Sequence, residues 1–165
     1  MTRDDEPAPA AADLRLLRAA FAVAARAHAA GQHPFGAVLA GPDGRVLMRQ
    51  GNAFLPAHDM TGHAERVLMT RASRRWRPDF LAGCTLASSA EPCAMCAGAA
   101  YWAGVGRVVY GLSERRLRAL TGAHPENPTL DLACRAVFAA GQRPVTVVGP
   151  LLEEEAAALH VGAWG

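Results

Sequence analysis

The chain contains no lysine and no isoleucine, and all 17 of its basic residues are arginine. Its formal net charge is only +2. A charge this small does not favour nucleic-acid binding, so nucleic acid is not an expected partner. No run of 18 apolar residues is present either, which excludes an ordinary membrane-spanning helix. We therefore expect a globular protein.

Cysteine is scarce too, with four residues, Cys84, Cys93, Cys96 and Cys134. A chain of 165 residues can bury a core large enough to fold without disulfide bonds. Residues 1–12 are acidic and proline-rich, and they lack the basic start and apolar centre of a secretory signal. We predict a disordered lead-in over 1–12, a single domain over 13–165 and a cytoplasmic location.

Hydrophobic periodicity predicts an alternation of helices and strands. Apolar residues recur at helical spacing over 13–30, and a hairpin is expected over 35–51 around the turn "GPDG". Further helices are predicted over 62–76, 92–104, 113–120, 130–142 and 151–164, with strands over 84–90, 106–113 and 143–150. This order predicts an α/β fold of about five strands with helices on both faces of the sheet.

Two short motifs stand where predicted helices begin. "HAE" covers His63 to Glu65, and "PCAMC" covers 92–96. Cys93 and Cys96 lie three residues apart and share one helix face. Such a pair is compatible with a redox couple, with half of a structural zinc site, or with two ligands of a catalytic metal.

The number of ligands favours the catalytic metal. His63, Cys93 and Cys96 offer three, whereas structural zinc uses four protein ligands and catalytic zinc leaves one position for water. Glu65 stands beside this set as a proton acceptor and donor. H-x-E followed by P-C-x-x-C is a zinc-deaminase signature. A redox couple of the two cysteines would not explain the presence of the "HAE" motif.

A third hypothesis is a zinc-stabilised scaffold protein without turnover. It would need a fourth protein ligand, from Cys84 or Cys134, or an occluded pocket. We interpret both cysteines as inert buried thiols, because Cys84 begins a predicted strand and Cys134 lies on a predicted amphipathic helix.

The sequence resembles the cytidine/deoxycytidylate deaminase superfamily, in the branch of guanine deaminases and tRNA adenosine deaminases. The stretches "HPFGAVLA", "TGHAE", "SSAEPCAMCAGAAYWAGVGRVVYG" and "GPLLEEEAAAL" carry the resemblance. It implies a three-layer α/β/α sandwich with a five-stranded mixed sheet, a homodimer and one zinc ion per subunit. It also implies hydrolytic release of ammonia from a nucleobase, with zinc on His63, Cys93 and Cys96 and Glu65 moving protons.

The same resemblance suggests a substrate pocket. Asn52 matches an asparagine that contacts the base, and "PFGA" and "AAYWA" resemble guanine deaminases more than tRNA enzymes. Guanine is therefore the leading substrate, with tRNA adenosine, cytosine and nucleosides as alternatives. The candidate pocket residues are Asn52, Phe35, Trp102 and the backbone of Ala64, with His124, Glu126 and Asn127 as weaker candidates from a loop that departs from the family pattern.

The remaining polar residues carry weaker signals. His28, His33, His58 and His160 show no partner pattern in the sequence and are interpreted as ordinary surface or satisfied histidines. The run Arg66, Arg71, Arg74, Arg75 and Arg77 is interpreted as a solvated helix face rather than a phosphate-binding surface. Trp164 is compatible with covering a neighbouring subunit's site or with packing the last helix.

Overall fold

The computed structural model describes residues 8–164 and is built around one mixed sheet with strand order β2-β1-β3-β4-β5. β1 pairs antiparallel with both β2 and β3, whereas β3–β4 and β4–β5 are parallel. The strands are β1 Gly36–Ala40, β2 Val46–Gly51, β3 Thr85–Ala90, β4 Arg107–Leu112 and β5 Thr146–Val148. The expectation of a five-stranded mixed sheet is confirmed.

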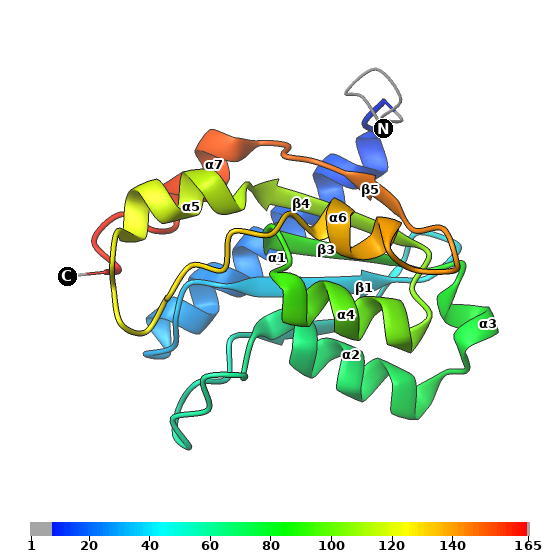
Figure 1. Ribbon diagram of the computed structural model, residues 1–165, viewed down its shortest axis with the longest axis horizontal. Helices are drawn as coiled ribbons and strands as arrows, with labels where there is room; N and C mark the ends of the chain where they lie inside the picture. Colours follow the sequence, from blue (N-terminus) through cyan, green and yellow to red (C-terminus); the bar gives the residue numbers. More distant parts are fainter. Residues whose placement is uncertain (1–7, 165) are drawn as a thin grey trace.

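Helices cover both faces of this sheet (Figure 1). α2, α3, α4 and α6 share one apolar core with the sheet, and α1, α5 and α7 share the other. Their bounds are α1 Ala11–Ala29, α2 Ala64–Arg75, α3 Pro78–Leu81, α4 Ala94–Ala103, α5 Glu114–Thr121, α6 Cys134–Ala139 and α7 Glu153–Ala158. The predicted three-layer α/β/α sandwich is thus confirmed. Among the described residues no helix is both long and apolar enough to cross a bilayer.

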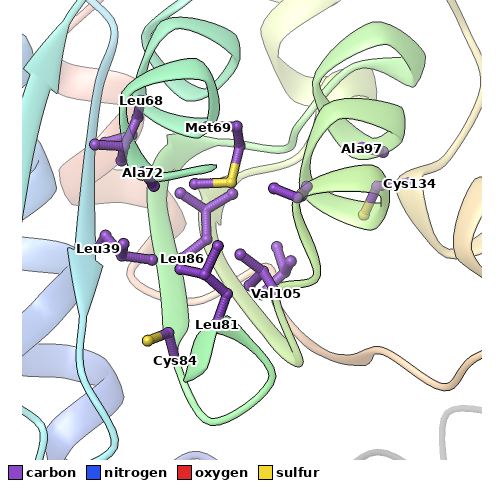
Figure 2. Packing of buried hydrophobic residues seen from close by; sticks show 14 of the residues in the cluster. Leu39, Leu68, Met69, Ala72, Leu81, Cys84, Leu86, Ala97, Val105 and Cys134 are labelled. Atoms are coloured by element: carbon purple, nitrogen blue, oxygen red, sulfur yellow. The ribbon is translucent and has the colours of Figure 1, made fainter. Parts of the chain in front are cut away.

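The core beneath α2 and α4 holds those two helices against the sheet (Figure 2). Met69 of α2 lies over Leu86 of β3, Leu68 packs in the same cluster, and each of the three is at most 2% exposed. Ala97 lies on the inward side of α4 and is fully buried. Small alanines on both helices allow close packing, so the two helix beginnings lie at one edge of the sheet.

On the opposite face, α1 approaches the sheet closely at Gly36. A Cβ atom at this position would collide with the backbone of Ala20 and Ala24. Glycine is therefore required where the strand passes beneath the helix. This contact helps to place Phe35, the residue before β1, at the edge where the strand begins.

Several element boundaries differ from expectation. α1 begins at Ala11, so the last two residues of the predicted lead-in are helical, whereas residues 1–7 of that prediction lie outside the described residues. The helix predicted over 130–142 is only Cys134–Ala139, and the one predicted over 151–164 is only Glu153–Ala158. Both predictions counted apolar residues on irregular backbone, and some of these, such as Leu132 and Val161, are exposed. A short helix, α3, occupies the predicted break after residue 76.

Aromatic and histidine rings gather where the C-terminal segment meets the segment before β1. The indole of Trp164 lies between 5.2 and 6.0 Å from the rings of His33, Phe35, His124 and His160. His33 also stacks on Phe54 at 4.8 Å. Trp164 therefore packs within its own chain. His33 and His160 thus have partners within the protein, and these partners come from segments that are distant in the sequence.

His160 is the most buried member of this cluster, at 4% exposure. Its Nδ1 accepts a hydrogen bond from Nε1 of Trp164 at 3.1 Å, and its buried Nε2 has no partner in the described residues. Burial lowers the pKa of His160 to about 4. The ring is therefore neutral in the folded state, because protonating Nδ1 would break the bond to Trp164 and bury a charge.

Acid should destabilise the protein through His160. Its pKa is depressed in the folded state, so from about pH 6.5 down to about 4 only the unfolded chain binds the proton. The free energy of unfolding should fall by about 1.4 kcal/mol per pH unit from this group across that window. Urea denaturation of wild type and His160→Leu between pH 4 and 8 measures the difference. Equal pH dependence in the two proteins would contradict this assignment.

Candidate metal and catalytic site

The site forms where α2 and α4 begin. His63 is the N-cap residue of α2 and Cys93 that of α4, and neither side chain makes a capping hydrogen bond. An N-cap position usually carries a serine, threonine, aspartate or asparagine that satisfies a free backbone N–H. Here the two side chains point at each other instead. Cys96 reaches the same point from the first turn of α4, as the spacing of three residues requires.

The three predicted ligands converge on one position. Nδ1 of His63 lies 3.6 Å from Sγ of Cys93 and 3.6 Å from Sγ of Cys96. The three ligand atoms all fall within 4.8 Å of one another. Zinc bonds of about 2.0–2.1 Å to nitrogen and about 2.3 Å to sulfur, at tetrahedral angles, separate N from S by about 3.6 Å. The donor set and its spacing therefore fit a zinc ion.

The protonation of the two thiols also suits a metal. The hydrogen bond from Cys96 lowers the pKa of Cys93 to about 4, with a further contribution from His63. The same bond to Cys93, together with burial, raises the pKa of Cys96. One thiolate is thus already formed on Cys93, and a divalent cation would remove the second proton, since coordinated thiols are deprotonated.

Glu65 lies beside the ligands and is 6% exposed. Its Oε1 accepts a hydrogen bond from Oγ of Ser88 at 2.9 Å, and Sγ of Cys96 lies 3.8 Å from its Oε2. Burial raises the pKa of the Glu65 carboxyl above its ordinary value. A carboxyl shifted in this direction is suited to general acid–base work near neutral pH.

A cavity of about 220 Å³ opens onto these residues. His63, Glu65 and Cys93 line one side, and the other walls come from the segment before β1, the end of β3 and the region that follows β4. The remaining lining residues are Phe35, Ala90, Glu91, Met95, Glu114, Leu117, Asn127, Pro128 and Leu130. The cavity is thus largely apolar with several carboxyl groups.

Of the residues predicted from the sequence for the substrate pocket, Phe35 and Asn127 line this cavity. Ala64 is fully buried as the first residue of α2, between the ligand and the acid. Glu126 pairs with His33 at 2.7 Å, and Nδ1 of His124 accepts the backbone N–H of Glu126 at 3.2 Å. These two residues are thereby tied to the aromatic cluster, next to the residues that line the cavity.

Two predicted pocket residues are placed differently. Asn52 is buried just after β2, and its Oδ1 accepts the backbone N–H of Phe54 at 3.0 Å. It closes a local turn and is not one of the described residues that line the cavity. Trp102 is 84% exposed on α4 and is also absent from that lining.

The sequence did not identify three residues of the site. Ser88 bonds Glu65, and Glu91 and Glu114 line the cavity. Ser88 is a hydroxyl in the apolar strand β3, where a buried polar group needs a partner. That signal was available in "CTLASSA". No comparable signal marked Glu114, because its place in the cavity depends on how β4 and α5 meet the metal-binding helix.

Comparisons with known proteins agree with this geometry. The family model described as the cytidine and deoxycytidylate deaminase zinc-binding region matches residues 11–112. A probable cytosine deaminase of Schizosaccharomyces pombe is 41% identical over 152 residues, which are 92% of this chain and 92% of that protein.

Solved structures are similar too. A guanine deaminase from Nitrosomonas europaea has a TM-score of 0.76 and 26% identity, covering 96% of this chain and 88% of its own. A tRNA:A34 deaminase has a TM-score of 0.66 and 29% identity, covering 88% of this chain and 99% of its own. The chain belongs to the cytidine and deoxycytidylate deaminase family and is a zinc-dependent hydrolytic deaminase.

Proposed function

We propose that this deaminase acts on a free nucleobase, with guanine as the leading substrate. The observation that carries the proposal is the cavity of about 220 Å³, which is smaller than the roughly 300–1,000 Å³ typical of sites for drug-sized ligands. A single base suits this space better than a nucleoside. The fold likeness to a guanine deaminase over 96% of the chain supports the choice of base.

Cytosine is the second candidate. The relative that is 41% identical over 92% of this chain is described as a probable cytosine deaminase. The reaction would be the same for both bases, because each carries an amino group on a ring carbon next to a ring nitrogen. Hydrolysis replaces that amino group with oxygen and releases ammonia.

In this proposal His63, Cys93 and Cys96 hold the zinc ion, which supplies a water whose pKa is lowered toward neutrality. Glu65 moves the protons. Its Oε1 is occupied by Ser88, so Oε2 is the oxygen that takes up and returns a proton. A metal-bound Cys96 no longer donates toward Oε2, which leaves that atom free to face the base. Glu65 would pass one proton of the water to the ring nitrogen and then pass the second to the departing amine, which leaves as ammonia.

We propose that tRNA is not the substrate, although tRNA deaminases are among the similar proteins. The arginine run along α2 is largely engaged in local contacts. Arg66 bonds Asp59 and the carbonyl of Thr61, and Arg71 bonds the side chain of Gln50. Arginines held in this way are less available to phosphates.

We further propose a homodimer formed through α4, in the cytoplasm, where the free cysteines stay reduced. α4 contains no charged residue, yet Trp102 at its outer side is 84% exposed. A helix that is apolar all round is normally buried. Tryptophan is enriched in protein interfaces. The role we assign to Trp102 is therefore a subunit contact.

Ammonia release from the zinc-loaded protein tests the substrate. The panel holds guanine, cytosine, adenine, their nucleosides and an unmodified tRNA. We expect turnover of guanine, or of cytosine as the second candidate, and slower turnover of the matching nucleoside. Activity confined to tRNA would overturn the free-base proposal and give the arginine face a role.

Two substitutions separate proton transfer from metal binding. Glu65→Gln should retain zinc and lower kcat by about 10²–10⁴-fold, because the amide cannot carry the proton. Cys93→Ala should instead lose zinc, activity and part of the stability. Zinc content, kcat and thermal unfolding are measured on both variants. Undiminished turnover in Glu65→Gln, or full zinc content in Cys93→Ala, would refute the corresponding role.

Trp102→Arg tests the dimer. The charged side chain should prevent association, so light scattering should give the mass of one 17.3 kDa chain where wild type gives twice that mass. Val161→Arg is the matched control, since Val161 is 80% exposed near α7 on the other side of the sheet. A wild type that is monomeric, or a Trp102→Arg variant that still dimerises, would contradict the proposed interface.

A further inference from the structure

The carboxyl groups of the cavity are not equivalent. Glu65 accepts a hydrogen bond from Ser88 at 2.9 Å. Glu91 accepts two backbone N–H groups, from Glu114 at 3.1 Å and from Cys134 at 3.0 Å. The carboxyl of Glu114 makes no hydrogen bond or ion pair in the part of the chain that the structure describes. It lines the cavity all the same.

The backbone of Glu114 is held firmly. It is the first residue of α5, and its N–H is bonded to Glu91, two residues from the metal ligand Cys93. The preceding residue, Ser113, donates both its N–H and its hydroxyl to Glu153. α5 thus starts from a fixed point. An unpartnered carboxyl group on a fixed element is suited to bind a ligand rather than to stabilise the fold.

The position of Glu114 determines which edge of a base it meets. Glu65 lies at the buried end of the cavity, at 6% exposure, so the reacting carbon must point there. Glu114 is only half-buried, and Leu130, another lining residue, is 54% exposed. From its greater exposure we infer that Glu114 lies nearer the open side of the cavity than Glu65 does, and the edge of the ring away from the reacting carbon would face that side.

We propose that Glu114 is a specificity-determining residue whose carboxylate accepts a hydrogen bond from a ring N–H of the free base. This inference rests on the proposed function. The relevant N–H is the one whose nitrogen carries ribose in a nucleoside, N1–H in cytosine and N9–H in guanine. A nucleoside has no proton there and brings a bulky sugar toward the carboxylate. Glu114 thereby selects free bases.

The electrostatic surroundings support this role. Burial is the main reason that the pKa of Glu114 rises to about 7, with nearby carboxyl groups and Cys93 contributing. A partly desolvated carboxyl group without a partner gains most from a donor supplied by a ligand. Apolar residues such as Leu117 beside it keep competing water away.

The test is binding of bases and their N-methyl analogues to the zinc-loaded protein, measured by calorimetry in a Glu65→Gln background that prevents turnover. The ligands are cytosine, guanine, 1-methylcytosine and 9-methylguanine. Glu114→Ala should weaken binding of the preferred base about 10- to 100-fold, the loss expected for a hydrogen bond to a charged group. Binding of the methyl analogue should change less than about twofold, because it never had this N–H to donate.

Glu114→Gln, which preserves shape, and Glu154→Gln, on exposed α7, are the controls. Glu114→Gln should show an intermediate loss and Glu154→Gln none, with zinc content unchanged in all variants. Equal weakening of base and methyl analogue, or no weakening, would overturn the role of Glu114 while leaving the proposed function intact. If no base binds to the parent protein and wild type turns none over, both proposals fail.

Discussion

Everything at this site depends on two helices beginning at the same place. Three ligand atoms can meet within bonding range of one ion only if the starts of α2 and α4 lie side by side, and the core between the helices enforces this. Met69 of α2 lies in this core, and Leu68 and Ala97 belong to the same apolar cluster, all with almost no exposure. The close packing of small residues on both helices thus has a chemical consequence, because it sets the spacing of 3.6 Å between the imidazole and each thiol.

The same arrangement explains why catalytic groups occupy positions that usually carry capping residues. A histidine or cysteine at an N-cap leaves a backbone N–H without its usual side-chain partner. Neither helix gains a capping bond here. The missing capping bonds lower the stability of the two helix N-termini, and in exchange the side chains can face a shared point. The apolar cores on both faces of the sheet compensate for this loss.

The chemistry-bearing motifs were predictable from the sequence because each is local. His63 and Glu65 are separated by one residue, as Cys93 and Cys96 are by two, and helical geometry alone places each pair. The alternation of helices and strands was predictable for the same reason. Helix lengths near the C-terminus were not, since Leu130 is an exposed apolar residue on irregular backbone and Trp164 packs from irregular backbone.

The rest of the pocket depends on contacts between segments that are far apart in the sequence. Trp102 sits next to a matching motif but points outward from α4, and only the packing of that helix decides this. His33 meets Glu126 across 93 residues of sequence. Resemblance identified Asn52 as a pocket residue, whereas the structure shows it closing a turn with Phe54. The positions of these side chains are determined by tertiary packing, which cannot be deduced from composition and periodicity.

The cavity concentrates negative charge. Three carboxyl groups, on Glu65, Glu91 and Glu114, share one small space with a thiol pair. Burial, with Cys93 and the neighbouring carboxyl groups contributing, raises the pKa of Glu114 in this site. A divalent cation on the three ligands would favour the charged form of nearby carboxyl groups. Glu91 is already engaged by two backbone N–H groups. In the proposal, Glu65 transfers protons at the buried end of the cavity. Glu114 accepts a hydrogen bond from the base at the outer side. In the proposed mechanism this division assigns the reaction to Glu65 and the choice of substrate to Glu114.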